Sequence, residues 1–419
     1  MKQQQFKKTV LASLLTLTSG VALSAPYEVI DLGGLGGNYS VAFGINEQGV
    51  AVGTANGALD DNNERLFNGH AAIYTDSFAT DLGVLENGSL SEATDINSSM
   101  IAVGYSNVIT ETELENGGTS TTVENFATLF DNGAVQKLPS HENLVQTKAY
   151  ALNNNNLIVG TGFFLPEGSQ EAYERGFVYD HNNGTYTLVD PLTGEQERQS
   201  YLVDINEAGM ALGYSDAFLN ATTFTIKSFV FDTSNGEISE LPTFENSYTF
   251  AQGLNVHGEI VGSVQLTLSD TLQEAFYYDL SSGSEELTFL GFLQPEFNDS
   301  RARSINDNGQ IVGRALISAP TLNEHAAFIY ENNEMKNLNE LIACDSGWKL
   351  TEATDINNAG QIVGFGVKDG EIRAFRLDPT GGDVEVCETD DDTKSGGGSI
   401  PLITLMILGF VGLRRKLNK

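Results

Sequence analysis

ATDINNAGQIVGFG, residues 353–366, is the stretch that decides the fold, because closely related phrases occur seven times along the chain. The other six begin at residues 42, 93, 149, 201, 251 and 303. Every phrase contains one asparagine in the same place, and the seven are Asn46, Asn97, Asn153, Asn206, Asn255, Asn306 and Asn357. They follow one another at intervals of 51, 56, 53, 49, 51 and 51 residues. So regular a period indicates a repeat architecture.

Each phrase predicts a β-hairpin. An apolar run comes before the asparagine and a second apolar run follows, with Asn-x-x-Gly between them, as in Asn46 to Gly49. An asparagine at the first turn position can bond its own backbone, and glycine accepts the left-handed conformation. The glycine that closes the second run predicts close packing or a bulge at the strand end. These glycines are Gly53, Gly104, Gly160, Gly213, Gly262, Gly313 and Gly364.

A third strand follows each hairpin, and a fourth follows it in the first six repeats. The third has sequences such as HAAIY from His70 and HAAFIY from His325, and the fourth runs into a leucine, as in ATDLGVL from Ala79. Four strands in ~50 residues match one blade of a propeller. The sequence therefore predicts an all-β fold, a seven-bladed β-propeller with four-stranded blades.

The two ends of the repeat region predict how the ring closes. The seventh repeat has its hairpin and RAFRL from Arg373 but no fourth strand. YEVIDLGGLGG, residues 27–37, is similar to the fourth strand of the first repeat. We expect this N-terminal strand to complete the last blade, since closure removes exposed sheet edges. The predicted propeller domain spans residues 26–380.

Residues 1–25 have the pattern of a signal peptide. Three lysines precede an apolar stretch, residues 10–23, and small residues end at Ala25. This pattern predicts export and cleavage by signal peptidase after Ala25. An uncleaved N-terminal membrane helix is the alternative.

The C-terminal residues predict a second signal. An acidic linker, residues 381–395, precedes the segment 396–419, and Ser395–Leu413 contains no charge. As a helix, this stretch would reach roughly 28 Å, close to the ~30 Å hydrocarbon core of a bilayer. Two arginines and a lysine follow it, which favours a cytoplasmic end. A plain C-terminal membrane anchor is one reading, and a removable sorting segment is the other.

The third strands resemble those of the HAF-repeat family of extracellular bacterial proteins, and His70-Ala-Ala and His325-Ala-Ala-Phe match best. That family implies export and architecture but no activity. The tail is similar to the GlyGly-CTERM signal of Gram-negative bacteria, with Gly396, Gly397 and Gly398 ahead of the apolar stretch. The resemblance implies a rhombosortase-like intramembrane protease as a processing partner, cutting near these glycines, and contact with the membrane before that cut.

Charge excludes one class of ligand. Without the three basic residues of the signal peptide and the four of the tail, 15 basic and 56 acidic residues remain, a net charge near −41. Such a surface repels phosphates, so nucleic-acid binding is discarded. The only two cysteines, Cys344 and Cys387, predict a disulfide in an exported protein, which would hold the segment after the last repeat against the domain.

No catalytic, metal-binding or cofactor-binding motif is recognised. The five histidines lack metal-ligand spacing, and His70 and His325 are expected to occupy equivalent strand positions in a structural role. The Asp-x-Asn triplets beginning at Asp95, Asp204 and Asp355 lack the alternating acidic series of a calcium loop and are assigned to turn chemistry.

The predicted function is a non-catalytic binding or interaction module, exported or at the cell surface, with an unknown extracellular ligand. The long segments 56–68, 106–125 and 163–174 are expected to be loops that carry binding residues. Two alternatives stay open, a polysaccharide-acting glycosidase or lyase and a structural envelope component. Two or three carboxylates with an arginine or aromatic wall around the axis would favour the enzyme.

Overall fold

The computed structural model describes residues 25–384, except 63, 115–116, 221–222, 245–246 and 266–271. The chain divides into two compact units, Met1–Glu385 and Val386–Lys419. The second unit lies outside the described residues, as do Cys387, residues 1–24 of the predicted signal peptide and the predicted sorting segment. In the described part, no helix is long and apolar enough to cross a membrane.

The described residues form strands almost throughout, with two short 3-10 helices, η1 (Leu280–Ser282) and η2 (Leu338–Glu340). The strands are β1 (Tyr27–Asp31), β2 (Gly36–Ile45), β3 (Ala51–Gly57), β4 (His70–Thr75), β5 (Phe78–Gly83), β6 (Ser91–Ile96), β7 (Ala102–Glu113), β8 (Thr119–Asp131), β9 (Ala134–Lys137), β10 (Leu144–Leu152), β11 (Leu157–Phe164), β12 (Tyr173–Asp180), β13 (Thr185–Val189), β14 (Ser200–Ile205), β15 (Met210–Asn220), β16 (Thr223–Asp232), β17 (Ile238–Glu240), β18 (Tyr248–Leu254), β19 (Glu259–Gln265), β20 (Gln273–Asp279), β21 (Thr288–Gly291), β22 (Ser300–Ile305), β23 (Ile311–Leu316), β24 (His325–Glu331), β25 (Glu334–Asn337), β26 (Trp348–Ile356), β27 (Ile362–Lys368) and β28 (Glu371–Pro379).

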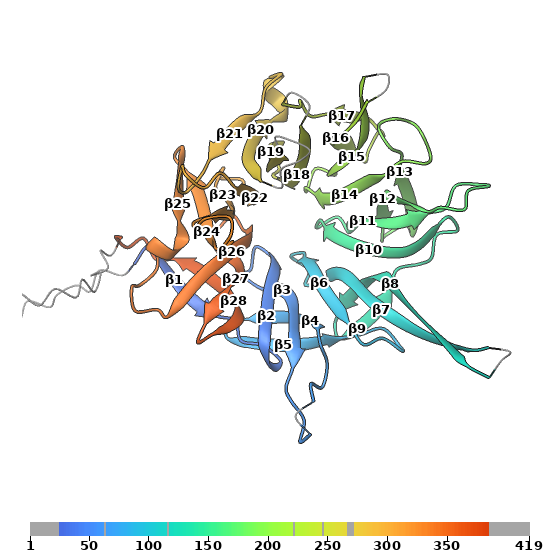
Figure 1. The fold of residues 1–419 in the computed structure, drawn as a ribbon, viewed down its shortest axis with the longest axis horizontal. Coiled ribbons are helices and arrows are strands. Elements are labelled where there is room, and N and C mark those ends of the chain that lie inside the picture. The colour runs from blue at the N-terminus through green and yellow to red at the C-terminus, as the bar shows by residue number, and fades with distance from the viewer. Residues whose placement is uncertain are drawn as a thin grey trace, which may run out of the picture. The chain divides into compact units, whose positions relative to one another are not determined.

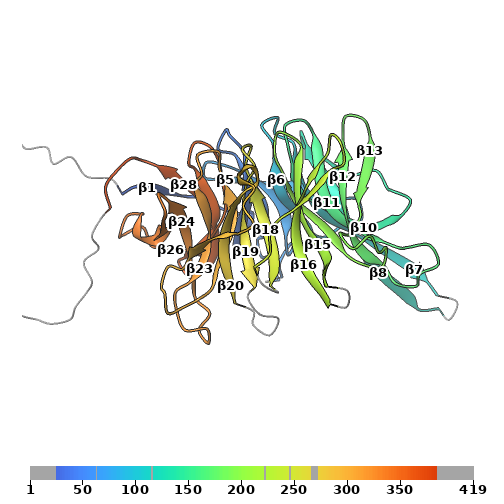
Figure 2. The same cartoon turned by 90° about the horizontal axis from the view of Figure 1, so that it is seen from above.

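Five repeats each form an antiparallel four-stranded sheet, β6–β9, β10–β13, β14–β17, β18–β21 and β22–β25. The first and last repeats share one eight-stranded sheet, in which β2 meets β28 at the parallel pair Tyr39 and Ile372. Figure 1 shows the sheets arranged around a central axis, and Figure 2 shows the same ring from its side. The predicted all-β class and the four-stranded repeat unit are confirmed.

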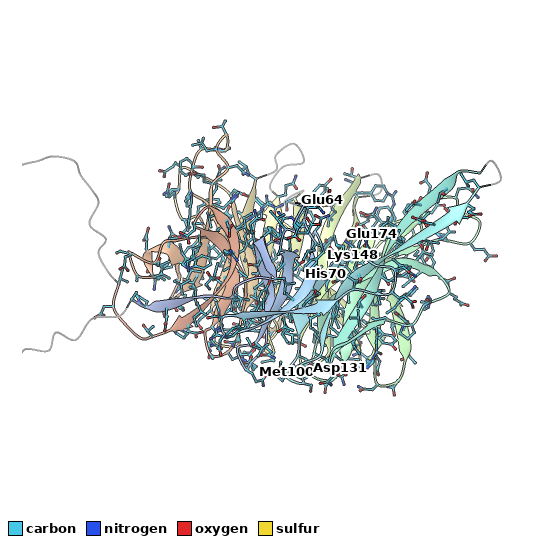
Figure 3. The ribbon with its side chains drawn as sticks, turned by 90° about the horizontal axis from the view of Figure 1, so that it is seen from below. Glu64, His70, Met100, Asp131, Lys148 and Glu174 are labelled. Carbon is cyan, nitrogen blue, oxygen red and sulfur yellow. The ribbon has the colours of Figure 1, made fainter. Side chains whose placement is uncertain are left out.

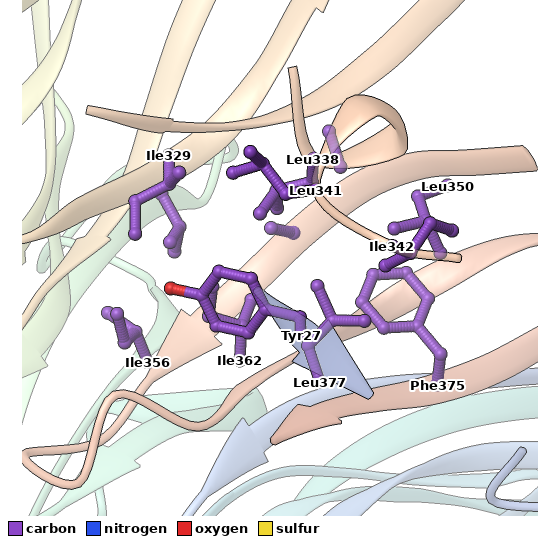
Figure 4. Close-up of a cluster of buried hydrophobic side chains, with 13 residues drawn as sticks. Tyr27, Ile329, Leu338, Leu341, Ile342, Leu350, Ile356, Ile362, Phe375 and Leu377 are labelled. Carbon is purple, nitrogen blue, oxygen red and sulfur yellow. The ribbon is translucent and has the colours of Figure 1, made fainter. Parts of the chain in front are cut away.

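The N-terminal strand pairs with the last strand. β1 pairs with β28 in antiparallel register from Tyr27 opposite Pro379 to Asp31 opposite Phe375. Tyr27 is buried within an apolar cluster that includes Leu341, Ile342, Phe375 and Leu377 (Figure 4). Of the predicted segment 27–37, only residues 27–31 form this strand, because Gly36 and Gly37 already belong to β2.

The turn chemistry predicted for each phrase is confirmed. In the first repeat the Asn46 side-chain oxygen accepts hydrogen bonds from the backbone N–H groups of Gln48 and Val50, at 3.1 and 3.0 Å. The other six asparagines make the same pair of bonds. Where the fourth turn residue is not glycine, Met100 and Asn156 adopt the left-handed conformation, with φ of 65° and 59°.

The closing glycines do not stand at strand ends, which corrects one expectation. Gly53 lies inside β3, and the bulge lies on the partner strand, between Ala42 and Gly44. A Cβ on Gly53 would be 1.9 Å from the backbone oxygen of Val41. At all seven positions this distance is between 1.9 and 2.2 Å, so glycine is required by close strand approach.

One expected loop is a strand extension. Residues 106–125 belong mostly to β7 and β8, which stay paired from Ala102 opposite Phe130 to Glu113 opposite Thr119. The paired strands form an arm that extends from the ring (Figure 1). Segment 163–174 does contain a loop, between the end of β11 at Phe164 and the start of β12 at Tyr173. Cys344 is disulfide-bonded.

Candidate functional site

The seven asparagines define one face of the ring, here called the asparagine face. Each side-chain nitrogen donates to the backbone oxygen of the asparagine in the next repeat, from Asn46 to Asn97 and onward at 2.9–3.5 Å. Asn357 donates back to Asn46 at 3.0 Å, which completes the circuit. The sequence signal for this contact was the absence of aspartate from all seven positions, since a carboxylate suits the turn equally but cannot donate.

Three aspartates two positions before the asparagine link neighbouring repeats. Asp204 accepts hydrogen bonds from the backbone N–H of Ile205 and from that of Leu254 in the next repeat, both at 2.8 Å. Asp95 and Asp355 make equivalent pairs of bonds to their own and the following repeat. The triplets were assigned to turn chemistry. This is correct for their asparagines, but it is wrong for their aspartates, which link neighbouring repeats. Among the described residues no group of metal-ligating side chains fits a cation.

These three carboxyl groups lie near one another in a buried setting. Burial raises the pKa of Asp95 to about 7, and the charge of Asp355 adds to the increase. Burial likewise raises the pKa of Asp204 to about 7 and raises that of Asp355. Asp95 and Asp204 are therefore partly protonated near neutral pH.

Asp204→Asn is expected to change how stability depends on pH. Because the folded-state pKa lies above the unfolded value, the native state binds the extra proton between about pH 4 and 7, and the wild-type protein loses stability as pH rises through that range. The loss is on the order of 1 kcal/mol per pH unit for this group. Asparagine does not titrate. The free energy of unfolding of the variant, measured in urea from pH 5 to 8, should therefore rise relative to that of the wild type as the pH increases. If the difference in free energy of unfolding between the two proteins stayed constant over this pH range, the raised pKa of Asp204 would be contradicted.

Away from the asparagine turn, the two strands of each repeat's hairpin carry side chains that differ in charge and size from one repeat to the next. The residue five places before each asparagine is Val41, Glu92, Lys148, Tyr201, Phe250, Arg301 or Glu352, and the residue after each closing glycine is Thr54, Tyr105, Thr161, Tyr214, Ser263, Arg314 or Phe365. We call the region formed by these fourteen residues the variable face; nine of them are half-buried and five are buried. In Figure 3, Met100, which belongs to an asparagine turn, lies at one edge of the ring, and Lys148 lies well away from that edge.

Aromatic side chains line one half of the variable face. The ring of Tyr214 stacks on Tyr201 at 4.7 Å between centroids and meets Phe250 edge-on at 5.5 Å. The Lys148 ammonium lies 4.2 Å from the centre of the Tyr105 ring. This aromatic arc (Tyr105, Tyr150, Tyr201, Tyr214 and Phe250) is half-buried.

A cavity of about 250 Å³ borders the arc. It is lined by Lys148, Tyr150 and Glu174, among others. The Tyr201 hydroxyl donates to the Glu174 carboxylate. Burial, and then this carboxylate, raise the pKa of Tyr201, and burial raises the pKa of Tyr150 to about 12. The phenols therefore remain protonated and act as hydrogen-bond donors.

Arginines gather on the other half of the variable face. Arg303 Nε donates to Glu352 Oε1 at 2.6 Å, and an Arg314 terminal nitrogen donates to Glu352 Oε2 at 3.0 Å. Arg301 Nε lies 3.6 Å from Asp299 Oδ1. Three of the eight arginines between residues 25 and 384 thus share one repeat. These arginines form no recognised motif in the sequence, although SRARS and VGRAL hold them at matching repeat positions.

The two strand histidines are not equivalent, which corrects another expectation. His70 pairs with Ala55, two residues after its closing glycine, whereas His325 pairs with Leu316, three residues after its own. A shift of one residue turns a side chain to the other face of the sheet. His70 stacks on Phe67 and His325 lies 3.5 Å from Asp299.

Repeated four-stranded antiparallel sheets around an axis, with a uniform face and a variable face, define a repeat β-propeller. The chain belongs to the family described as "Protein of unknown function (DUF3466)", which matches residues 84–244 and 242–371. No curated protein matches the chain.

Solved structures that are similar to the chain share little sequence identity with it, and one of them is a β-propeller domain. The β-propeller domain of the Trilobed protease from Pyrococcus furiosus is 11% identical, with a TM-score of 0.47, over 81% of this chain and 94% of that one. Acylaminoacyl peptidase from Pyrococcus horikoshii is 10% identical, with a TM-score of 0.48, over 91% of this chain and 54% of that one. TolB from Acinetobacter baumannii is 12% identical, with a TM-score of 0.38, over 83% and 66%.

Proposed function

We propose that the protein is an exported seven-bladed propeller whose eight-stranded sheet comprises two blades, the last of them completed by β1. The hydrogen-bond circuit of seven asparagines and the pairing of β1 with β28 support this reading. We extend the proposal to a HAF-repeat protein processed by signal peptidase and by a rhombosortase-like protease near Gly396–Gly398. The sequence patterns at the two ends of the chain support that part.

The proposed activity is non-catalytic binding of a polysaccharide at the variable face. One observation carries it: the residues paired across the first two strands, away from the asparagine turn, differ in charge and size from repeat to repeat, whereas the asparagine itself recurs in all seven. The recurring asparagine suits a scaffold role, whereas a ligand with unlike parts requires unlike contacts. Aromatic rings beside protonated hydroxyls and carboxylates suit sugars, which present both apolar ring faces and hydroxyl groups.

A polysaccharide-acting enzyme is the second candidate, favoured by the hydrogen bond between Tyr201 and Glu174. A tyrosine paired with a carboxylate could serve as a nucleophile or a proton carrier. The raised pKa of Tyr201 argues against the nucleophile, because the phenolate is disfavoured. Incubating oligosaccharides with the protein and analysing the products separates the two candidates, and cleavage would favour the enzyme.

Tyr214→Ala should weaken oligosaccharide binding about 10-fold or more, because the substitution removes the ring that contacts both Tyr201 and Phe250. The measurement is calorimetric titration with cellohexaose, a neutral probe, and with a hexagalacturonate, an acidic one. Tyr277→Ala is the matched control, since Tyr277 is likewise a half-buried tyrosine but lines a cavity beside the asparagine turn at Gly309. Equal losses in both variants, or no binding by the wild-type protein, would contradict the proposal.

A further inference from the structure

The cavity beside the aromatic arc is formed on one face of the third repeat's sheet. Lys148 on β10 pairs with Thr161 on β11, and Phe163, two residues further along β11, pairs with Glu174 on β12. Side chains that lie opposite each other, or two residues apart in a strand, point to the same face of a sheet. The register therefore brings Lys148 and Glu174 to one cavity of about 250 Å³ (Figure 3).

The Lys148 ammonium is positioned by an aromatic ring. It lies over Tyr105 of the preceding repeat, 4.2 Å from the ring centre, and its charge interacts with that of nearby Glu92. Among the residues that the structure describes, none forms a hydrogen bond or a direct ion pair with this ammonium. Because an ammonium has three N–H donors, Lys148 can donate to an acceptor in the cavity.

The Glu174 carboxylate lines the same cavity. Its Oε2 accepts a hydrogen bond from the hydroxyl of Tyr201 in the next repeat. Within the described part of the chain, its Oε1 accepts no hydrogen bond, and no ion pair joins Glu174 to Lys148. A cationic donor and an anionic acceptor therefore line one small space without direct contact between them.

Aromatic side chains complete the cavity. Tyr150 and Phe163 line it together with Lys148 and Glu174. Such rings offer an apolar surface, which suits the apolar face of a sugar ring. The volume lies below the ~300–1,000 Å³ of sites that enclose drug-sized molecules, so the cavity suits a single sugar residue.

The two opposite charges select the chemistry of the ligand. A group beside Lys148 must accept a hydrogen bond, and a group beside Glu174 must donate one. Two neighbouring hydroxyl groups of a sugar do both, because a hydroxyl is a donor and an acceptor. A carboxylate on the sugar suits Lys148 but is repelled by Glu174, and an ammonium group suits Glu174 but is repelled by Lys148.

We propose that this cavity binds an uncharged sugar residue through two neighbouring hydroxyl groups, one accepting from Lys148 and the other donating to Glu174. The inference rests on the polysaccharide site proposed above and names its ligand class. The sugar ring lies against Tyr150 and Phe163, and the rest of the polysaccharide continues along the aromatic arc.

The experiment compares cellohexaose with the same hexamer oxidised at every primary hydroxyl, which is a glucuronate chain of equal length and linkage. Calorimetric titration of the purified protein should show that the neutral hexamer binds about 10-fold more tightly or better, because Glu174 opposes a carboxylate in the cavity. This comparison uses the wild-type protein, so no folding defect of a variant affects it.

Substitutions at the two charged residues test the contacts one at a time. Lys148→Met removes the ammonium but keeps the length of the side chain, and it should weaken cellohexaose binding about 10-fold. Lys148→Arg keeps a cation over the Tyr105 ring and should stay within about threefold of wild type. Glu174→Gln removes the anionic acceptor, so it should weaken cellohexaose binding several-fold and reduce the preference for cellohexaose over the glucuronate hexamer.

Two matched controls lie outside the cavity. Lys137→Met removes another lysine that lies over an aromatic ring, that of Phe126. Glu171→Gln removes another carboxylate that accepts a hydrogen bond from a tyrosine, Tyr173. Each control should leave the affinity for cellohexaose within about twofold of wild type.

Equal or tighter binding of the glucuronate hexamer by the wild-type protein would overturn this inference. So would wild-type affinity for cellohexaose in both Lys148→Met and Glu174→Gln, or displacement of cellohexaose by excess alanine, a zwitterion that fits both charges. If Tyr214→Ala still weakens cellohexaose binding in any of these cases, the proposed function stands without this sugar site. Failure of both hexamers to bind would overturn the two together.

Discussion

Gly213→Ala is expected to lower the free energy of unfolding by roughly 3 kcal/mol, one of the two largest effects we predict. A Cβ at this position would lie 2.0 Å from the backbone oxygen of Tyr201 and 2.9 Å from a methyl carbon of Leu202. The Tyr201 oxygen cannot move without separating β14 from β15, which pair directly beside the bulge. The change in the urea midpoint and in the thermal transition measures the effect.

Gly34→Ala provides the matched control for this substitution. Its Cβ would meet nothing closer than 3.5 Å, an ordinary van der Waals contact, and the backbone there has no positive φ. The control should stay within about 0.5 kcal/mol of wild type. Similar stability of the two variants would show that strand approach at Gly213 is looser than the structure indicates.

Asn206→Asp is expected to lower stability by roughly 2–4 kcal/mol at pH 7. The carboxylate can still accept the turn bonds from Ala208 and Met210, but it cannot donate to the backbone oxygen of Asn255, 2.9 Å away. Two oxygens would then face each other in a buried site. Part of the loss should be recovered near pH 4, because a protonated carboxyl can donate again.

Asn235→Asp is the control for the asparagine circuit. Asn235 lies in an exposed turn, where its side-chain oxygen accepts one bond from Glu237 N at 2.7 Å. Its replacement should change stability by less than about 0.5 kcal/mol. If Asn206→Asp lowered the free energy of unfolding no more than this control, the hydrogen bond donated to the next repeat would not contribute to the stability of the ring.

The local structure was predictable because the sequence encodes it within a few residues. Asn46 and Gly49 specify a turn, and the apolar runs around them specify two strands, wherever the phrase occurs. The contact from Asn46 to Asn97 was not predictable in the same way, since it joins side chain and backbone 51 residues apart. Asp204 shows the same limit. Its triplet predicts turn chemistry, but the Asp204 side chain bridges two repeats. The bulge beside Asp204 turns this side chain toward Leu254 of the next repeat.

The candidate site was less predictable than the fold. Arg301 and Arg314 are 13 positions apart in the sequence, and only the pairing of β22 with β23 brings their side chains to one cavity. His70 and His325, which look equivalent in the sequence, differ by one residue in register. The residues of the variable face can be recognised in the sequence only when equivalent positions of the seven repeats are compared, because no single motif contains them.

The position of β1 has a consequence for the order of folding. Tyr27 and Pro379 are partners at opposite ends of the described chain, and Thr380 N also donates to Pro26 O at 2.9 Å. The first strand to be synthesised therefore has no partner until the last repeat has been made. Pairing over so long a loop is slow compared with forming each local hairpin. The hairpins of each repeat can therefore form during synthesis, whereas the pairing of β1 with β28 can form only after the last repeat has been made.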